Sequence, residues 1–203
     1  MNIVTGTPAD LSSEIMAGVA RYRHRVFIEK LGWQLRSENT LEYDQFDRDD
    51  TVYVVAHNTH GEVVGTARLL PTTRPYLLAE VFPHLLHGQS PPHSPEVWEL
   101  SRFAAVDFSA EGSSALAQFS SPVAVGLLQA SLECAAAHGA KRFITVSPLG
   151  VERLLRIAGF KAHRLAPPAV VDGNPIFACS ISCEVQTTES MAGVGSSALA
   201  LQA

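Results

Sequence analysis

Two apolar stretches joined by a short polar turn constrain the fold of this chain more than any other feature. Residues 51–56 (TVYVVA) and 62–70 (EVVGTARLL) are rich in β-branched residues, which favour strands. The HNTHG between them has the polar residues and the glycine of a short connection. The pattern predicts an antiparallel hairpin, and a hairpin is stable in water only with further strands or packed helices. The chain must therefore build a layered β structure around it.

Helical and strand patterns alternate along the rest of the sequence. Residues 11–31 place apolar side chains at helical spacing behind Ser12 or Ser13, either of which can cap a helix, and we expect one or two helices there. Residues 121–140 predict a helix with Ser121 as its cap and a proline in its first turn. The other expected elements are a long loop over 33–50, a short helical piece around 77–87, strands over 96–106 and 141–147, a helix over 148–160, and strands over 160–165 and 175–185.

This order of elements predicts an α/β fold, in which a mixed, twisted sheet is flanked by helices on both faces. We expect a single domain over residues 1–185. The remainder, 186–203, is rich in glycine, serine and alanine and is expected to be a disordered tail.

Composition excludes several classes of function. The chain has 203 residues, of which 46% are apolar and 17% charged, so we expect a globular protein. Its net charge of −5 argues against nucleic acid as a partner, because phosphate binding needs a basic face. No signal peptide and no run of about 20 apolar residues is visible, so we expect a cytoplasmic protein without a membrane partner. The three cysteines lack zinc spacing, which predicts reduced thiols and no metal.

Common catalytic and nucleotide-binding signatures are absent from the sequence. No GxGxxG follows a predicted strand, which argues against a dinucleotide cofactor and against a Rossmann-type methyltransferase. The GxxxxGK[ST], HExxH and GxSxG patterns are missing as well. No local pattern supports a Ser-His-Asp triad among the eight histidines.

Three charged residues stand inside stretches predicted to be strands. Arg68 lies in VVGTARLL, and Glu99 and Arg102 lie in VWELSRFAAV. An unpaired buried charge is costly, so each side chain must have a partner or line a cleft. A structural ion pair such as Arg68 with Glu99, a polar edge strand and a functional cleft all stay open. Residues 99 and 102 would face opposite sides of a regular strand, so a shared site requires a bulge or a strand end.

Aromatic and acidic residues gather in the segment before the hairpin. Arg23 and Phe27 are one helical turn apart with Trp33 just beyond, and Asp44 and Asp47 follow in EYDQFDRDD. Taken singly, these groups are typical of a core aromatic pair beside a solvated arginine and of an exposed acidic turn. Taken together, aromatics beside paired carboxylates suit a ligand that carries a positive charge and a flat ring.

These groups, in this order, resemble the acyl-homoserine-lactone synthases, the LuxI-type autoinducer synthases of bacterial quorum sensing. The resemblance looks closest to the synthases of Burkholderia-like bacteria and implies a fold similar to the GNAT N-acetyltransferases. The matching stretches, over roughly residues 20–166, are RYRHRVFIEKLGW, EYDQFDRDDTVYVVA, GTARLLPT, VWELSRFAAV and ITVSPLGVERLLRIAGF.

The resemblance also implies a reaction with two substrates. An acyl chain would arrive as a thioester on acyl carrier protein and would be attacked by the amine of S-adenosyl-L-methionine. The methionyl carboxylate would then displace 5′-methylthioadenosine to close the lactone. Because S-adenosyl-L-methionine is a substrate, no separate cofactor is implied. Its sulfonium and its adenine match the expected cationic ligand with a flat ring.

Four residues at the motif positions would contact this substrate. The resemblance implies that Phe27 and Trp33 pack against it. It implies that Arg23 and Arg68 bind its carboxylate or brace the acidic loop, EYDQFDRDD at residues 42–50.

Four further residues, together with Arg23 and Arg68, would form the catalytic machinery. Asp44 and Asp47 would order the N-terminal loop and balance positive charge. Glu99 would be the general base, acting through a water, because the amine must lose a proton before it attacks. Arg102 would anchor Glu99 or the acidic loop. Oxyanion stabilisation would come from backbone N–H groups near residues 101–105.

The acyl chain would need an apolar tunnel. Within the resemblance, a hydroxyl at Thr145 goes with acyl chains oxygenated at carbon 3, so we expect a 3-oxo- or 3-hydroxyacyl substrate. The alternative is that Thr145 bonds a neighbouring carbonyl. The expected walls are Phe82, Leu100, Phe103, Thr145, Val146 and Leu149.

Acyl carrier protein is strongly acidic, so its docking surface should be basic. Six basic residues concentrate between positions 141 and 164, although any one of them is also typical of a solvated helix face. They are Lys141, Arg142, Arg153, Arg156, Lys161 and Arg164.

Two other functions compete with the synthase. A GNAT-type N-acetyltransferase using acyl-CoA would share the fold, but AEGSSALAQFSSPVAV lacks a good glycine loop for the pyrophosphate. A catalytically inactive binding protein is disfavoured by the full set of charged motif residues.

Overall fold

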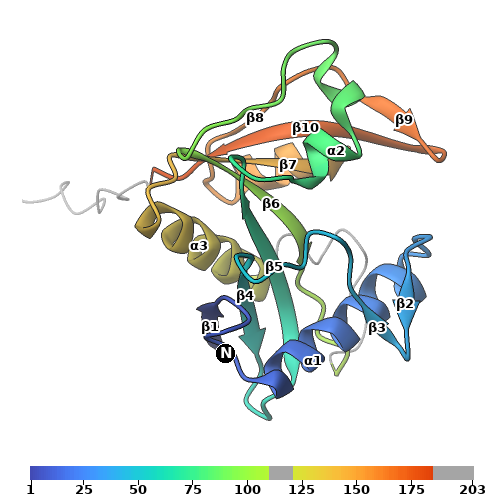
Figure 1. Cartoon of the computed structure of the whole chain (residues 1–203), viewed down its shortest axis with the longest axis vertical. Coiled ribbons are helices and arrows are strands. Elements are labelled where there is room, and N and C mark those ends of the chain that lie inside the picture. Colours follow the sequence, from blue (N-terminus) through green and yellow to red (C-terminus); the bar gives the residue numbers. More distant parts are fainter. Residues whose placement is uncertain (110–120, 185–203) are drawn as a thin grey trace, which may run out of the picture.

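The computed structural model describes residues 1–109 and 121–184 of the chain. Within these ranges, an eight-stranded sheet runs through the centre of the molecule in the order β1-β4-β5-β6-β7-β10-β8, with β9 paired to β10 (Figure 1). Only β6 and β7 run parallel to each other; the other neighbours are antiparallel. The strands are β1 (Asn2–Gly6), β4 (Val52–His57), β5 (Val63–Pro71), β6 (Val97–Ala104), β7 (Arg142–Pro148), β8 (Ala162–Arg164), β9 (Ala169–Val171) and β10 (Asn174–Ser182).

The predicted hairpin is confirmed as β4 and β5, and its alternating side chains serve two layers. Val52 and Val54 belong to one apolar cluster, whereas Tyr53 and Val55 belong to another. Both clusters are buried because helices cover both faces of the strands. The hairpin is therefore the centre of the core rather than its edge.

Two of the described helices begin at serine caps that the sequence supplies. The Ser12 hydroxyl accepts a hydrogen bond from the Ile15 N–H at 3.2 Å, and Ser121 does the same for Ala124 at 3.1 Å, as predicted. The last helix instead begins at Gly150, which offers no side-chain cap. The helices are α1 (Ser13–Arg23), the π-helix η1 (His24–Lys30), α2 (Leu77–Glu80), the 3₁₀-helix η2 (Pro83–Leu86), α3 (Pro122–Ala137) and α4 (Val151–Ile157).

Helices lie on both faces of the sheet, as predicted. Figure 1 shows α1 and α3 on opposite sides of β4 and β5. Helix α4 joins the layer of α3, since Leu155 packs in the same cluster as Leu127. Helix α2 lies on the other face, where Leu78 packs with Leu70 and Ile144.

The central strands β6 and β7 part from each other halfway along. Their pairing covers only three positions and ends at Glu99 opposite Ile144. Beyond that point β6 continues against β5, and β7 continues against β10. The sheet therefore has a gap at its centre, bounded by the carboxyl-terminal halves of two parallel strands.

Several elements differ from the sequence-based expectations. The strands β1 and β9 were not predicted, and the expected loop over 33–50 contains a small hairpin of β2 (Ser37–Glu38) and β3 (Leu41–Glu42). The predicted tail, 186–203, lies outside the described residues.

Candidate active site

The π-helix η1 places aromatic side chains beside the central gap. Its wider turn brings Val26 and Phe27 together onto the buried side of the helix. The chain folds back after the helix, and the backbone N–H of Trp33 donates a hydrogen bond to the Phe27 carbonyl at 2.9 Å. The two rings stack at 4.9 Å with an interplanar angle of 20°. Phe27 is buried and Trp33 is 42% exposed, so the stack offers one open aromatic face.

Three arginines and three carboxylates form a closed ring of alternating charges, called the charge ring below, next to this aromatic stack. The nitrogen–oxygen distances around the ring run from 2.5 to 3.3 Å. The ring joins α1, the acidic loop, β5 and β6, which are remote in sequence. In order, its members are Arg23, Glu42, Arg102, Asp44, Arg68 and Asp47, which returns to Arg23.

Asp47 is the most fully bonded carboxylate of the ring. It accepts hydrogen bonds from Arg23 at 2.7 and 3.0 Å, from the Tyr53 hydroxyl at 2.7 Å and from the Asp44 N–H at 2.7 Å. Burial raises the pKa of Asp47, but the charges of Arg23 and Arg68 and these bonds outweigh burial and hold it below its ordinary value. The carboxylate therefore stays ionised.

The cations that these acids hold belong to the chain itself. Each ring carboxylate already bonds two arginines, so Asp44 and Asp47 balance positive charge within the chain, which is the role expected of them. Arg23 and Arg68 are fully buried and brace the acidic loop, which was one of their two expected roles. Buried charges of opposite sign in equal number compensate one another.

A β-bulge turns Arg102 toward the ring. Two steps along β5, from Thr66 to Arg68, face three steps along β6, from Ser101 to Ala104. Arg102 takes the extra position with a left-handed φ of 50°. The sequence required an irregularity only if Glu99 and Arg102 share one site; the observed bulge lies just after Ser101, and both Ser101 and Arg102 line the cavity described below.

Glu99 lies apart from the ring. Its oxygens accept hydrogen bonds from the Leu77 N–H at 2.8 Å and the Leu78 N–H at 2.7 Å at the start of α2. Neither Arg68 nor Arg102 bonds it: Arg102 anchors the acidic loop instead. Burial raises the pKa of Glu99 to about 7, against the lowering effect of the two N–H groups and of the Arg68 charge. Such a carboxyl can take up a proton near neutral pH.

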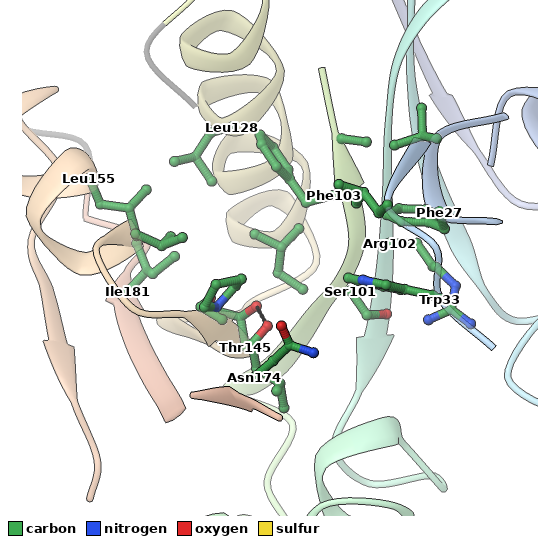
Figure 2. Close-up of a pocket in the computed structure, with 18 of the residues that line it drawn as sticks. Phe27, Trp33, Ser101, Arg102, Phe103, Leu128, Thr145, Leu155, Asn174 and Ile181 are labelled. Carbon is green, nitrogen blue, oxygen red and sulfur yellow. Dashed lines mark hydrogen bonds between the residues drawn. The ribbon is translucent and has the colours of Figure 1, made fainter. Parts of the chain in front are cut away.

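A cavity of about 310 Å³ fills the gap between β6 and β7. One end lies against η1, where Phe27, Trp33 and Arg102 line it. The other end lies against α3 and α4, where Leu128 and Leu155 line it (Figure 2). The cavity therefore passes from one helix layer to the other through the sheet, with an aromatic and charged end and an apolar end.

Most of the predicted acyl-chain walls line this cavity. The exception is Phe82, which packs with the cluster around Leu78 and Leu85 on the α2 face, so its assignment as a wall is corrected. Additional apolar side chains contribute from α3, α4 and β10. The predicted residues that line the cavity are Leu100, Phe103, Thr145, Val146 and Leu149, and the additional ones include Leu128, Val151, Leu155 and Ile181.

Thr145 presents a hydroxyl to the cavity. Among the described residues, its Oγ donates only to the Val146 carbonyl, at 3.5 Å, which is too long for a good hydrogen bond. The alternative, in which Thr145 satisfies itself on a neighbouring carbonyl, is therefore poorly met. A buried hydroxyl of this kind favours a ligand oxygen as its partner.

The six basic residues predicted to bind acyl carrier protein are all exposed. Three of them pair with acids: Lys141 with Glu96, Lys161 with Glu184 and Arg164 with Glu152. In the part of the chain that the structure describes, Arg142, Arg153 and Arg156 form no ion pair.

Sequence reasoning missed Glu42, Tyr53 and Ser101 as members of the site. Glu42 belongs to the acidic stretch that drew attention, but nothing in its spacing marked it as 1% exposed and bonded to Arg23 and Arg102. Ser101 accepts a hydrogen bond from the Arg68 Nε at 3.0 Å and lines the cavity.

Among residues 1–109 and 121–184, no group of three or more metal-ligating side chains gathers at one place. Within the same ranges, no helix has the length and the apolar character to cross a membrane.

Comparison with solved structures defines the fold class. The fold matches that of a putative N-acetyltransferase from Lactobacillus plantarum, with a TM-score of 0.60 over 90% of this chain and 97% of that one, at 18% identity. At this identity the likeness shows the fold alone, which is GNAT-like, as predicted.

Sequence comparison then defines the family. The family described as Autoinducer synthase matches residues 9–191. An acyl-homoserine-lactone synthase of Acinetobacter nosocomialis is 53% identical over 181 residues, which are 89% of this chain and 99% of that protein. One of Ralstonia solanacearum is 48% identical over 87% of this chain and 86% of that protein. The chain belongs to the autoinducer synthase family and is an acyltransferase of the acyl-homoserine-lactone synthase type.

Two solved structures carry ligands in related chains. TofI, in a ternary complex with an inhibitor and MTA, gives a TM-score of 0.79 at 46% identity, over 92% of this chain and 94% of that one. BjaI, a CoA-dependent acyl-homoserine lactone synthase with SAM and isopentyl-CoA, gives 0.77 at 30% identity, over 91% and 83%.

Proposed function

We propose that this enzyme transfers an acyl chain from acyl carrier protein to the amine of S-adenosyl-L-methionine and then closes the lactone with release of 5′-methylthioadenosine. The observation that carries the proposal is the cavity across the sheet, with its two chemically different ends. The related structures with MTA and with SAM and isopentyl-CoA support the nucleotide substrate and a thioester as acyl donor.

Each end of the cavity suits one reactant. The stacked Phe27 and Trp33 offer an aromatic face for the adenine and the sulfonium of the nucleotide. Leu128, Leu155 and Ile181 form an apolar end for the acyl chain. The thioester and the amine would meet between the two ends.

The reaction needs one proton acceptor. The amine nitrogen attacks the thioester carbonyl, the carbon–sulfur bond of the thioester breaks, and the thiolate leaves. Glu99 takes the proton of the amine through a water, because the carboxylate itself is fully buried and does not line the cavity. Its raised pKa suits a base that works near neutral pH. The charge ring holds the acidic loop and Arg102 in place during these steps.

The acyl donor is proposed to be acyl carrier protein rather than coenzyme A. Arg142, Arg153 and Arg156 are exposed and carry no acidic partner among the described residues, so they are available to an acidic protein surface. Coenzyme A is the second candidate, because BjaI is described as CoA-dependent. Thr145 supports a donor whose acyl chain bears oxygen at carbon 3.

The test is a donor panel. The purified enzyme is incubated with S-adenosyl-L-methionine and matched acyl chains on acyl carrier protein and on coenzyme A, and mass spectrometry measures the lactone and 5′-methylthioadenosine. We expect both products and a higher kcat/KM for the carrier protein. Arg153→Glu with Arg156→Glu should raise the KM for acyl carrier protein and leave the KM for S-adenosyl-L-methionine unchanged.

The matched control is Arg21→Glu, the same charge reversal at an exposed arginine on α1. It should leave the KM for acyl carrier protein unchanged. Absence of lactone with every donor would overturn the proposed reaction, and equal or better use of coenzyme A would overturn the proposed donor.

A further inference from the structure

Arg102 is the arginine of the charge ring that also lines the cavity. Arg23 and Arg68 belong to the same ring, but both are fully buried and neither lines the cavity. The three arginines therefore differ in what they can reach, although they have the same kind of carboxylate partners.

The hydrogen bonds of Arg102 leave one guanidinium nitrogen free. Nε donates to Glu42 at 3.2 and 3.3 Å, and Nη2 donates to Glu42 at 2.9 Å and to Asp44 at 2.8 Å. Nη1 has no hydrogen-bond partner among the described residues, and it is not one of the buried unpaired atoms. Nη1 therefore reaches accessible space, and the cavity is the space that Arg102 lines.

The other two arginines offer the cavity no such donor. Arg23 uses Nε, Nη1 and Nη2 on Glu42 and Asp47. Arg68 has an unpaired Nη2, but that atom is buried. A substrate anion in the cavity would meet the free Nη1 of Arg102 and neither of the others.

The backbone holds Arg102 in a conformation that arginine rarely adopts. Its φ of 50° and the bulge against β5 direct the side chain to the ring and the cavity together. Its guanidinium carbon lies 5.6 Å from the centre of the Phe27 ring, and Phe27 stacks on Trp33. Figure 2 shows Arg102, Phe27 and Trp33 together at one end of the cavity.

We propose that Arg102 binds the carboxylate of the amino-acid portion of S-adenosyl-L-methionine through Nη1. A guanidinium is the side chain best suited to a carboxylate, and the aromatic stack beside it would hold the nucleotide portion of the same molecule. The inference rests on the proposed function and assigns to Arg102 the carboxylate contact that was one of the two roles expected of Arg23 and Arg68.

The contact would position the carboxylate for ring closure. In that step a carboxylate oxygen attacks the CH₂ bonded to sulfur, and the carbon–sulfur bond breaks with its electron pair going to sulfur. The sulfonium leaves as the neutral thioether 5′-methylthioadenosine. Arg102 gives up no proton, because its guanidinium stays charged throughout.

The test compares two ligands that differ only in the carboxylate. Isothermal titration measures the affinity of the intact enzyme for S-adenosyl-L-methionine and for decarboxylated S-adenosyl-L-methionine, which keeps the amine, the sulfonium and the adenosine. We expect the wild type to prefer the carboxylated ligand by about 10- to 100-fold, the range of a hydrogen bond to a charged group. Arg102→Gln should reduce this preference to less than about 3-fold.

The matched control is Arg23→Gln, which removes another arginine bonded to Glu42 but leaves the cavity lining intact. It should keep the preference ratio, even if its thermal midpoint falls. If Arg102→Gln does not fold, Arg102→Lys is used in its place, since it keeps the charge but loses the planar fork, and it should lower the ratio as well.

Equal affinity of the wild type for the two ligands would overturn the inference, and so would an unchanged ratio in a folded Arg102 variant. Failure of the proposed function is seen separately, as the absence of lactone from S-adenosyl-L-methionine in the donor panel.

Discussion

Replacing Asp47 by asparagine tests whether the charge ring holds the site together. Asparagine keeps the shape of the side chain but removes its charge and turns one acceptor into a donor. Four hydrogen bonds reach the Asp47 carboxylate, and Arg68 lies 3.3 Å away. Removing one partner from a buried ion pair costs about 3–5 kcal/mol, because it leaves an uncompensated charge. We expect the free energy of unfolding at pH 7 to fall by that amount.

The assay is urea unfolding followed by tryptophan fluorescence. The control is Asp50→Asn, the same chemical change at a carboxylate whose side chain is 33% exposed and bonds Arg48 at 2.9 Å. A pair this exposed should contribute only about 0–1 kcal/mol. A domain of this size has about 5–15 kcal/mol of stability, so the Asp47 variant should still fold, with a clearly lower urea midpoint.

The pH dependence gives a second reading of the same change. The pKa of Asp47 is lower in the folded chain than its ordinary value of 3.8. Its contribution is therefore fully present above pH 3.8 and is lost as the pH falls toward the folded-state pKa. The stability gap between wild type and Asp47→Asn should shrink as the pH is lowered through about 4. A gap below about 1 kcal/mol at pH 7, or one equal to that of Asp50→Asn, would refute the reasoning.

Two further predictions concern the chemistry in the cavity. Turnover by Glu99→Gln should fall by about 10²- to 10⁴-fold, the usual contribution of a general base, with folding checked by thermal melting because the amide would face the Leu77 and Leu78 N–H groups. Wild-type turnover should rise with pH through about 7 as Glu99 loses its proton, and a variant with the same pH profile would contradict its role. Thr145→Gly should abolish a preference for 3-oxo- or 3-hydroxyacyl donors over plain chains, and an unchanged ratio of kcat/KM values would end that hypothesis.

Local patterns in the sequence predicted the elements that carry their own signals. The hairpin of β4 and β5 follows from β-branched residues around a glycine turn, and the caps at Ser12 and Ser121 follow from residue type. The need for an irregularity between Glu99 and Arg102 also follows from strand geometry alone. Each of these inferences uses residues close together in the chain.

The strands β1 and β9 could not be read in the same way. They are short, and β1 lies at the edge of the sheet, so its conformation depends on hydrogen bonds to β4, which lies about 50 residues further along the chain. The π-helical form of η1 could not be predicted from the sequence either, because Arg23 and Phe27 have ordinary α-helical spacing.

The sequence identified most charged residues of the site but not the pairs that they form. The residues around Arg68, Arg102 and the acidic stretch are enough to show that these charges would be costly to bury. Which arginine meets which carboxylate depends on how α1, β5 and β6 are packed, and this packing selected Glu42 in preference to Glu99. Phe82 was misplaced for the same reason, since it lies between α2 and η2 and packs against their cluster.

Under the proposed function, the two ends of the cavity would bind the acyl chain and the nucleotide separately. Mutations at Leu128 or Leu155 would alter which acyl chains fit, while the Phe27 and Trp33 stack, anchored to another helix layer, would be undisturbed. Related enzymes with this fold can therefore change the acyl chain of their product and keep the same nucleotide-binding site. A few apolar substitutions on one side of the sheet would then be enough to give two species signal molecules with different acyl chains.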